Sequence, residues 1–249
     1  MEEKQTVGAT DAPLYKPSAK AKLENYWYHY KWHSIAAVFV IIAILVCSLQ
    51  MCAKDSYDAY VLYAGDYEVK RTTEGGGVAE YQRFVDAFGR VCADNDGDGR
   101  GNVSFNNLFV LSAEQIAEIE SDPEHELGYA LLKSDAETLK DRLIYSEYYL
   151  CILSKEVYDE YKVIDGIPLF LPLAGYLPEG SEAVLYDEGA VELSSLEFGK
   201  IPVMLGLDGA VVCLRTKSAF AEHFNKKQNE KNFANCEQLL IGMLAYGEP

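Results

Sequence analysis

Three aspartates stand on alternate positions directly before a glycine in the stretch ADNDGDGRGNVSF, residues 93–105. In a twelve-residue calcium loop, positions 1, 3 and 5 supply side-chain oxygens, a glycine at position 6 allows the sharp turn, and position 7 lends its main-chain carbonyl. Those positions are filled, in order, by Asp94, Asp96, Asp98, Gly99 and Arg100. Because every ligand is an oxygen, the pattern indicates calcium.

The end of this loop departs from the calcium pattern. Position 12, where a bidentate carboxylate is expected, is Phe105, although Asn102 at position 9 can assist the ion. The last ligand must therefore come from another segment or from water, and the dissociation constant should lie near 10⁻⁴ to 10⁻³ M, roughly that of extracellular modules. The alternative is a solvated turn, because Asp, Asn and Gly also favour turns without metal. Mutual repulsion of three carboxylates favours the ion.

An uncharged stretch of twenty residues, 34–53, reads SIAAVFVIIAILVCSLQMCA. At helical rise it can cross a hydrocarbon core of about 30 Å, so we predict a transmembrane helix embedded in the lipid bilayer. A cleaved signal peptide is the alternative, but 33 residues precede the stretch and no small-residue cleavage site follows it. Basic residues before the stretch predict a cytoplasmic N-terminus and an extracellular C-terminal domain. These residues are Lys16, Lys20, Lys22 and Lys31.

The chain therefore divides into three expected parts: a disordered cytoplasmic and juxtamembrane tail over residues 1–33, the transmembrane helix over 34–53, and an extracellular domain over 55–249. The start of the tail is poor in large aliphatic residues and cannot bury enough surface to order itself. Residues 55–249 carry 16 basic and 35 acidic side chains, a balance of −19, whereas residues 1–54 carry a balance of +2. So acidic a domain repels phosphate backbones, which excludes nucleic acid as a partner.

Apolar periodicity predicts alternating strands and helices at the start of the domain. Strands are expected over residues 57–65, 102–111 and 147–154, and helices over 78–92, 112–120, 135–145 and 155–162. Strands joined by helices favour parallel pairing, so the expected fold is α/β, a layered domain with a mostly parallel sheet. Beyond it we expect a hairpin over 201–215 that turns at Asp208 and Gly209, and two helices over 218–231 and 232–246.

The segments DAYVLYAG, NVSFNNLFVL and ETLKDRLIYSEYYLCILS, with GKIPV further on, resemble the first lobe of extracellular solute-binding proteins of the type 2 periplasmic-binding class. The resemblance covers residues 57–161 and 183–216 and implies a lobe that binds a small ligand. The run HYKWH, residues 29–33, is similar to the start of single-pass anchored proteins of clostridial-type bacteria. Full solute-binding proteins have two substantial lobes, and residues 55–249 leave room for a short second lobe.

Ligands of open parallel sheets bind beyond the carboxyl ends of the strands. The residues expected there are Gly65, Asp66, Ser112 and Ser154, which we take as candidate ligand-binding residues; they also suit helix caps and turns. The aspartate loop instead precedes a strand, so an ion there would brace the fold.

Residues 75–77, three glycines before an expected helix, suit either an anion site or a flexible linker. Four cysteines of the domain lie in apolar patterns, where buried thiols are expected, with disulfides as the alternative. They are Cys92, Cys151, Cys213 and Cys236.

Residues typical of catalysis are scarce in the domain. His125 and His223 are its two histidines, and neither an HExxH nor a GxSxG pattern occurs. We therefore expect no enzyme. The sequence favours a membrane-anchored extracellular module that binds a small ligand or a partner and is braced by calcium. The alternative is a structural or assembly domain of the bacterial cell envelope, whose partners are envelope proteins and which has no small-molecule ligand.

Overall fold

The computed structural model describes residues 18–52, 57–71, 78–120, 129–217 and 225–247. The chain separates into two compact units, residues 1–55 and 56–249. The glycines at 75–77 and the histidines at 125 and 223 lie outside the described residues.

The first unit contains one long helix, α1 (Ala19–Cys52). An 18-residue stretch within Ala19–Ser48 has a mean hydropathy of 2.0 and no buried residues. Length and composition permit this helix to cross a membrane, and the same properties are typical of a signal sequence. The helix begins earlier than expected, because residues 19–33, assigned to the tail from the sequence, continue it without a break.

The second unit is built on a mixed six-stranded sheet in the order β2-β1-β3-β8-β7-β6. Strand β1 pairs in parallel with both β2 and β3, while β8, β7 and β6 follow β3 in antiparallel pairs. The strands are β1 (Ala59–Gly65), β2 (Val103–Phe109), β3 (Leu150–Ser154), β6 (Leu185–Asp187), β7 (Ala190–Glu192) and β8 (Ala210–Leu214). The α/β class is as expected. The expectation of a mostly parallel sheet is wrong beyond β3. A two-residue turn reverses the chain between β6 and β7, and 3₁₀ turns instead of a crossover helix connect β7 to β8.

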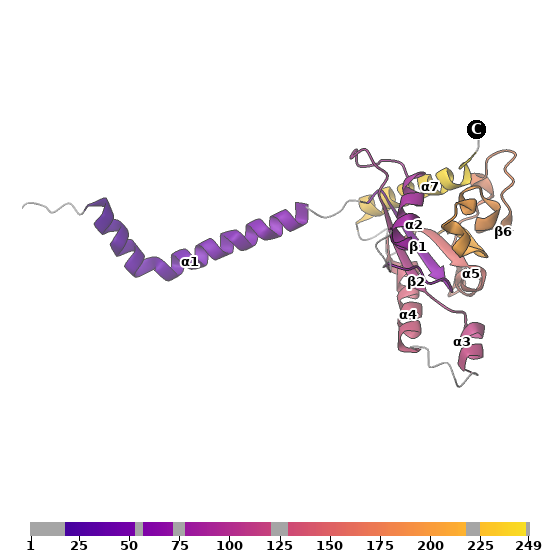
Figure 1. Ribbon diagram of the computed structural model, residues 1–249, viewed down its shortest axis with the longest axis horizontal. Coiled ribbons are helices and arrows are strands. Elements are labelled where there is room, and N and C mark those ends of the chain that lie inside the picture. The colour runs from indigo at the N-terminus through magenta and orange to yellow at the C-terminus, as the bar shows by residue number, and fades with distance from the viewer. Residues whose placement is uncertain (1–17, 53–56, 72–77, 121–128, 218–224, 248–249) are drawn as a thin grey trace, which may run out of the picture. The chain divides into compact units, whose positions relative to one another are not determined.

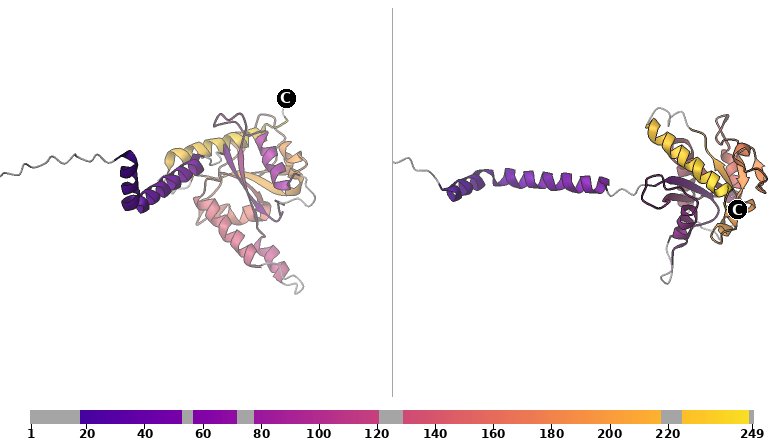
Figure 2. Two further views of the ribbon diagram at one scale, coloured as in Figure 1. Left: turned by 60° about the vertical axis from the view of Figure 1, so that its left-hand side comes forward. Right: turned by 90° about the horizontal axis from the view of Figure 1, so that it is seen from above.

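Helices cover both faces of this sheet (Figures 1 and 2). On one face Phe84 and Phe88 of α2 and Leu239 of α7 join the core that contains Val61 and Tyr63 of β1. On the other face α4 and α5 pack against the alternate β1 residues, such as Leu62. The helices are α2 (Glu80–Gly89), α3 (Ala113–Glu120), α4 (Tyr129–Tyr145), α5 (Lys155–Tyr161) and α7 (Lys226–Leu244). The domain therefore has three layers, which follows from the side-chain alternation of a central strand.

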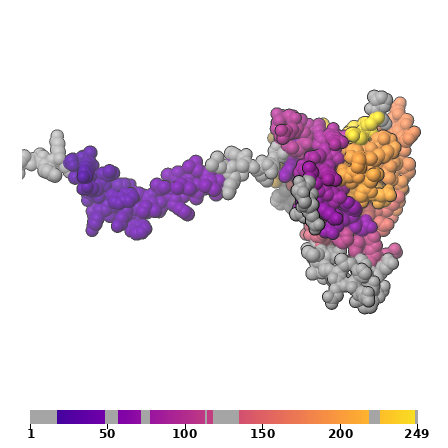
Figure 3. Space-filling view, viewed as in Figure 1, coloured from indigo at the N-terminus to yellow at the C-terminus, as the bar shows by residue number. Residues whose placement is uncertain are grey.

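Short elements fill the chain between α5 and β8. Strands β4 (Val163–Ile164) and β5 (Ile167–Pro168) form a separate hairpin. The 3₁₀ turns are η1 (Ala174–Tyr176), η2 (Leu193–Ser195), η3 (Phe198–Lys200) and η4 (Met204–Leu207). Figure 3 shows that the orange segment around η3 adjoins the purple and magenta α2 region on one face, in agreement with the 5.5 Å between the ring centres of Phe88 and Phe198.

Two expectations for the C-terminal third are wrong. Residues 204–207 form η4 instead of a strand, and β8 pairs with β3 and β7, so no hairpin turns at Asp208 and Gly209. A single helix, α7, runs through the boundary expected near residue 231, whereas residues 218–224 lie outside the described residues. The cysteines agree with the expectation of thiols. Cys151, Cys213 and Cys236 are buried, Cys92 is half-buried, and all four are free.

Arg215, directly after β8, is a fully buried arginine that pairs with no carboxylate among the described residues. Its guanidinium donates to the main-chain oxygens of Leu143 (2.9 Å), Tyr148 (3.2 Å) and Ser146, and it lies 4.7 Å from the ring centre of Tyr149. Desolvation lowers the pKa of this guanidinium. The acceptors belong to the last turn of α4 and the loop after it, where helix carbonyls lack partners. Arg215 thus attaches the end of α4 to the β3–β8 junction.

Replacing Arg215 by methionine should lower the free energy of unfolding by about 3 kcal/mol or more, because three buried carbonyls lose a charged donor. Urea unfolding followed by circular dichroism measures this loss. The matched control is Arg90→Met on the exposed surface, which should change stability by less than about 0.5 kcal/mol. Equal effects of the two substitutions would contradict the assigned role of Arg215.

Candidate functional site

The aspartate loop connects the end of α2 to the start of β2 and is held by its own side chains. The Asp94 carboxylate accepts hydrogen bonds from the N–H groups of Gly97 (2.6 Å) and Gly99 (2.8 Å). Asp96 accepts from the N–H of Asp98 at 3.1 Å. Gly99 has a φ of 85°, a left-handed conformation that glycine adopts without strain, as expected for position 6 of such a loop.

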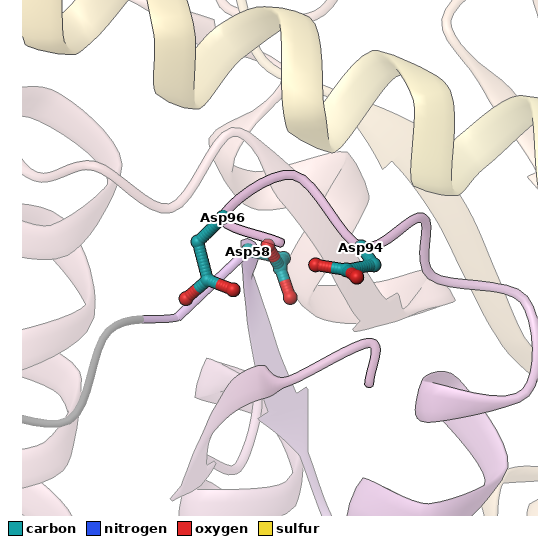
Figure 4. Close-up of side chains that lie close together, drawn as sticks. All are labelled: Asp58, Asp94 and Asp96. Atoms are coloured by element: carbon teal, nitrogen blue, oxygen red, sulfur yellow. The ribbon is translucent and has the colours of Figure 1, made fainter. Parts of the chain in front are cut away.

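Asp58, which immediately precedes β1, completes this loop from a distant part of the sequence. Only 2% of Asp58 is exposed, and its carboxylate accepts from the N–H groups of Asn95 (2.7 Å) and Asn102 (2.9 Å). One side-chain oxygen each of Asp58, Asp94 and Asp96 lies within 4.8 Å of the others. Figure 4 shows the three carboxylates side by side. Asp58 therefore adds a carboxylate from outside the loop, which has none at its twelfth position.

The other expected ligands of the loop are engaged differently. Asp98 accepts from the Arg100 N–H and from the Asn102 side-chain amide, both at 2.8 Å. The main-chain oxygen of Asn102 accepts from the N–H of Asp58 at 2.8 Å. Within the described residues, the acidic group close enough to share an ion is thus Asp58, Asp94 and Asp96, without Asp98.

Main-chain donors stabilise the charged form of Asp94. The N–H groups of Gly99 and then Gly97 lower the pKa of Asp94 below its ordinary value. Carboxylate oxygens grouped within 4.8 Å of one another are the kind of ligand that a hard divalent cation prefers. The same hydrogen bonds also satisfy the loop as a turn, so the geometry fits both interpretations made from the sequence.

The four candidate ligand-binding residues do meet at the carboxyl edge of β1 and β3, but the structure uses them internally. Ser154 caps α5 by accepting from the Val157 N–H at 3.3 Å. Ser112 and Gln115 form a reciprocal cap on α3, and the Gln115 amide reaches Asp66 at 3.3 Å. At Gly65 an added Cβ would lie 2.8 Å from the buried Tyr63 hydroxyl and 3.2 Å from the Cβ of Ser154, so the close packing favours glycine there.

A hollow of about 760 Å³ lies beside these residues, beyond the carboxyl ends of β1 and β2. It is strongly charged. Its walls are Glu68, Val69, Lys70, Arg71, Val78, Glu80, Arg83, Asn107, Phe109 and Asp135. None of the four candidate residues lines it. The sequence nevertheless pointed to the hollow. Lys70 and Arg71, two of its wall residues, follow the first strand, and ligands of open parallel sheets bind beyond the carboxyl ends of strands.

The walls of the hollow are fixed by hydrogen bonds. Glu80 accepts from the Tyr67 hydroxyl and from the Lys70 N–H (2.9 Å), and the first of these bonds raises the pKa of Tyr67 to about 12. Arg71 donates to Asn107 at 3.1 Å and lies 5.2 Å from the ring centre of Tyr81. Asp135 accepts from the Phe109 N–H at 3.2 Å. Hydrogen bonds therefore hold the described walls of the hollow in place.

Comparison with protein-family models, with curated proteins and with solved structures finds no match for this chain. The arguments below therefore rest on the geometry of this chain.

The hydrogen bonds to Asp94 predict a pH dependence of the loop. A carboxyl whose pKa is lowered in the folded state stabilises that state above the unfolded value of about 3.9, and the contribution disappears as the pH falls through the lowered pKa. The amide resonances of Gly97 and Gly99, followed by NMR during acid titration, should therefore shift together with a midpoint below that value. Asp94→Asn should abolish the shift. A midpoint at or above the ordinary aspartate value would contradict the role of these bonds.

Proposed function

We propose that this protein is a membrane-tethered module whose extracellular α/β domain binds a ligand or partner at the charged hollow and does not catalyse a reaction. The hollow is the observation that carries the proposal. It lies at the carboxyl ends of the two parallel strands β1 and β2, the edge of an open sheet at which ligands bind. Two of its three carboxylates, Glu80 and Asp135, accept from main-chain N–H groups, which suits binding better than proton transfer.

The proposed tether is α1, and its flanking charge supports the orientation. The lysines that precede residue 34 favour a cytoplasmic N-terminus, which would leave the domain beyond residue 54 extracellular. The parallel half of the sheet, β2-β1-β3, supports the resemblance to one lobe of a solute-binding protein. The antiparallel half departs from the lobe that we expected.

The alternative, an assembly domain of the cell envelope, is favoured by a different observation. The β4–β5 hairpin exposes two large aliphatic side chains, Val163 at 50% and Ile167 at 69%. Exposed apolar side chains at a hairpin tip suit contact with another protein. This hairpin lies outside the lining of the charged hollow, so the two functions are separable by experiment.

Calcium is proposed as a brace and not as part of the ligand site. An ion at Asp58, Asp94 and Asp96 would join the start of β1 to the loop that leads into β2. Since the two strands are neighbours, such an ion would stabilise their amino ends.

Titration calorimetry of the full-length protein in detergent tests the ion. Calcium should bind with a dissociation constant of about 10⁻⁴ to 10⁻³ M and raise the melting temperature. Asp96→Ala should abolish both effects while leaving stability in EDTA nearly unchanged. Asp58→Ala should in addition lower stability in EDTA by about 1–3 kcal/mol, because two N–H groups lose their acceptor. Asp141→Ala, exposed on α4, is the control. Absence of heat and of stabilisation in the unaltered protein would leave the loop as a turn.

Native mass spectrometry of the full-length protein tests the hollow. A small molecule should copurify with the unaltered protein and with Arg90→Gln, and its occupancy should fall by roughly tenfold in Arg71→Gln, because a charged hydrogen-bond donor is lost. Loss of occupancy in both variants would contradict binding at the hollow. If no small molecule is found and crosslinking captures an envelope protein that Ile167→Asp releases, the assembly function replaces the proposed one.

A further inference from the structure

Four lysines gather at the amino end of α7, in a domain that is otherwise strongly acidic. They are Lys217, Lys226, Lys227 and Lys231, and we call them the α7 lysine cluster. All four are exposed, and they make up a quarter of the 16 basic residues beyond residue 54. Such local enrichment against the overall charge indicates an anionic partner.

One packing contact attaches Lys217 to α7. The Lys217 ammonium lies 4.4 Å from the ring centre of Phe233, and that ring contacts Tyr149, directly before β3, with 5.4 Å between centres. Phe233 follows Lys226 by two helical turns on the same side of α7, whereas Lys227 and Lys231, four residues apart, share a different face. The four lysines therefore surround the first turns of α7.

The cluster lies at the edge of the sheet where β1 begins. The Asn235 side chain donates to the main-chain oxygen of Asp58 at 2.6 Å, and Lys231 is one helical turn, about 6 Å, before Asn235. In Figures 1 and 2 the amino end of α7, in darker yellow, points to the side of the domain on which β1 starts.

Chain length bounds the distance from this edge to the membrane. Asp58 follows the last residue of the apolar stretch, Ala53, by five residues, which can extend over at most about 18 Å. With α1 as the proposed anchor, the start of β1 stays within about 18 Å of the end of the apolar stretch. A lysine near an anionic bilayer is attracted over a Debye length of about 8 Å, and a cluster of lysines gains from each member.

We propose that the α7 lysine cluster binds the anionic headgroups of the bilayer that holds α1 and so fixes one orientation of the acidic domain. This inference rests on the proposed membrane anchor. The remainder of the domain is repelled by an anionic surface, which makes the orientation selective. The hollow, at the carboxyl ends of β1 and β2, then faces away from the lipid.

Two sets of described acidic groups lie close to the cluster. Glu230 lies 3.9 Å from the Lys226 ammonium, and Asp58, Asp94 and Asp96 lie near Asn235 on the same edge. The proposed calcium ion would offset their charge. Lipid contact is therefore measured both with calcium and with EDTA.

Lysine acetylation of the full-length protein in lipid nanodiscs tests the proposal. Discs of phosphatidylcholine are compared with discs of phosphatidylcholine and phosphatidylglycerol in equal parts, and modification is read by mass spectrometry. Acetylation of the cluster should be slower in the anionic discs, on the order of fivefold, and the protection should vanish in about 1 M salt. Lys140 and Lys200 are internal controls on other exposed surfaces and should not change.

Variants separate lipid contact from folding. In Lys226→Gln/Lys227→Gln/Lys231→Gln the protection of Lys217 should be lost, whereas the charge-matched Lys140→Gln/Lys162→Gln/Lys200→Gln should retain it. Slower acetylation of the cluster in the anionic discs supports the proposal, whether it occurs only with calcium or both with calcium and with EDTA. Equal acetylation in both kinds of disc, under both conditions, overturns it. A protein that stays in neither kind of disc refutes the anchor instead.

Discussion

The buried guanidinium of Arg215 links the two halves of the sheet. The parallel strands end at β3 and the antiparallel strands begin at β8, so the β3–β8 pair is where the sheet changes direction. Arg215 follows β8 and donates to carbonyls after α4, the helix that leads into β3. These acceptors are main-chain groups, so oriented dipoles, including the negative end of α4, balance the charge of the guanidinium. The helix, β3 and β8 are therefore constrained as one unit.

Next to that junction, strand β1 contributes side chains to both hydrophobic cores. Its neighbours on both sides are parallel strands, and its buried side chains alternate between the α2–α7 face and the α4–α5 face. A strand with this burial must be apolar throughout, which accounts for the run AYVLYAG. Polar groups can be accommodated at its two ends, where the chain leaves the core. Asp58 stands before the strand, and Asp66 and the charged hollow follow it.

The sequence was sufficient for features that depend on local patterns. Strands β1, β2 and β3, helices α2 and α5, and the glycine turn at Gly99 each have a periodic or turn signal of their own. It was insufficient where pairing between distant segments decides. Asp58 joins the aspartate loop only because β1 lies beside β2, and an isolated aspartate carries no sign of that contact. Arg215 resembles an ordinary exposed charge at the end of a strand. The antiparallel pairing of β8 with β3 was not predicted, because an apolar run of five residues does not show in which direction the strand runs.

The amino and carboxyl ends of the parallel strands carry different polar groups. This separation matters for the proposed anchoring of the domain. A seven-residue strand is about 23 Å long, so groups at its two ends are too far apart to share one ligand. The aspartate cluster and the α7 lysine cluster lie at the amino edge, beside the chain that leads to α1. The hollow lies at the carboxyl edge. In the proposed arrangement, attachment through the groups at the amino edge does not occupy the hollow. The two proposed roles, attachment and ligand binding, therefore use opposite ends of the same strands.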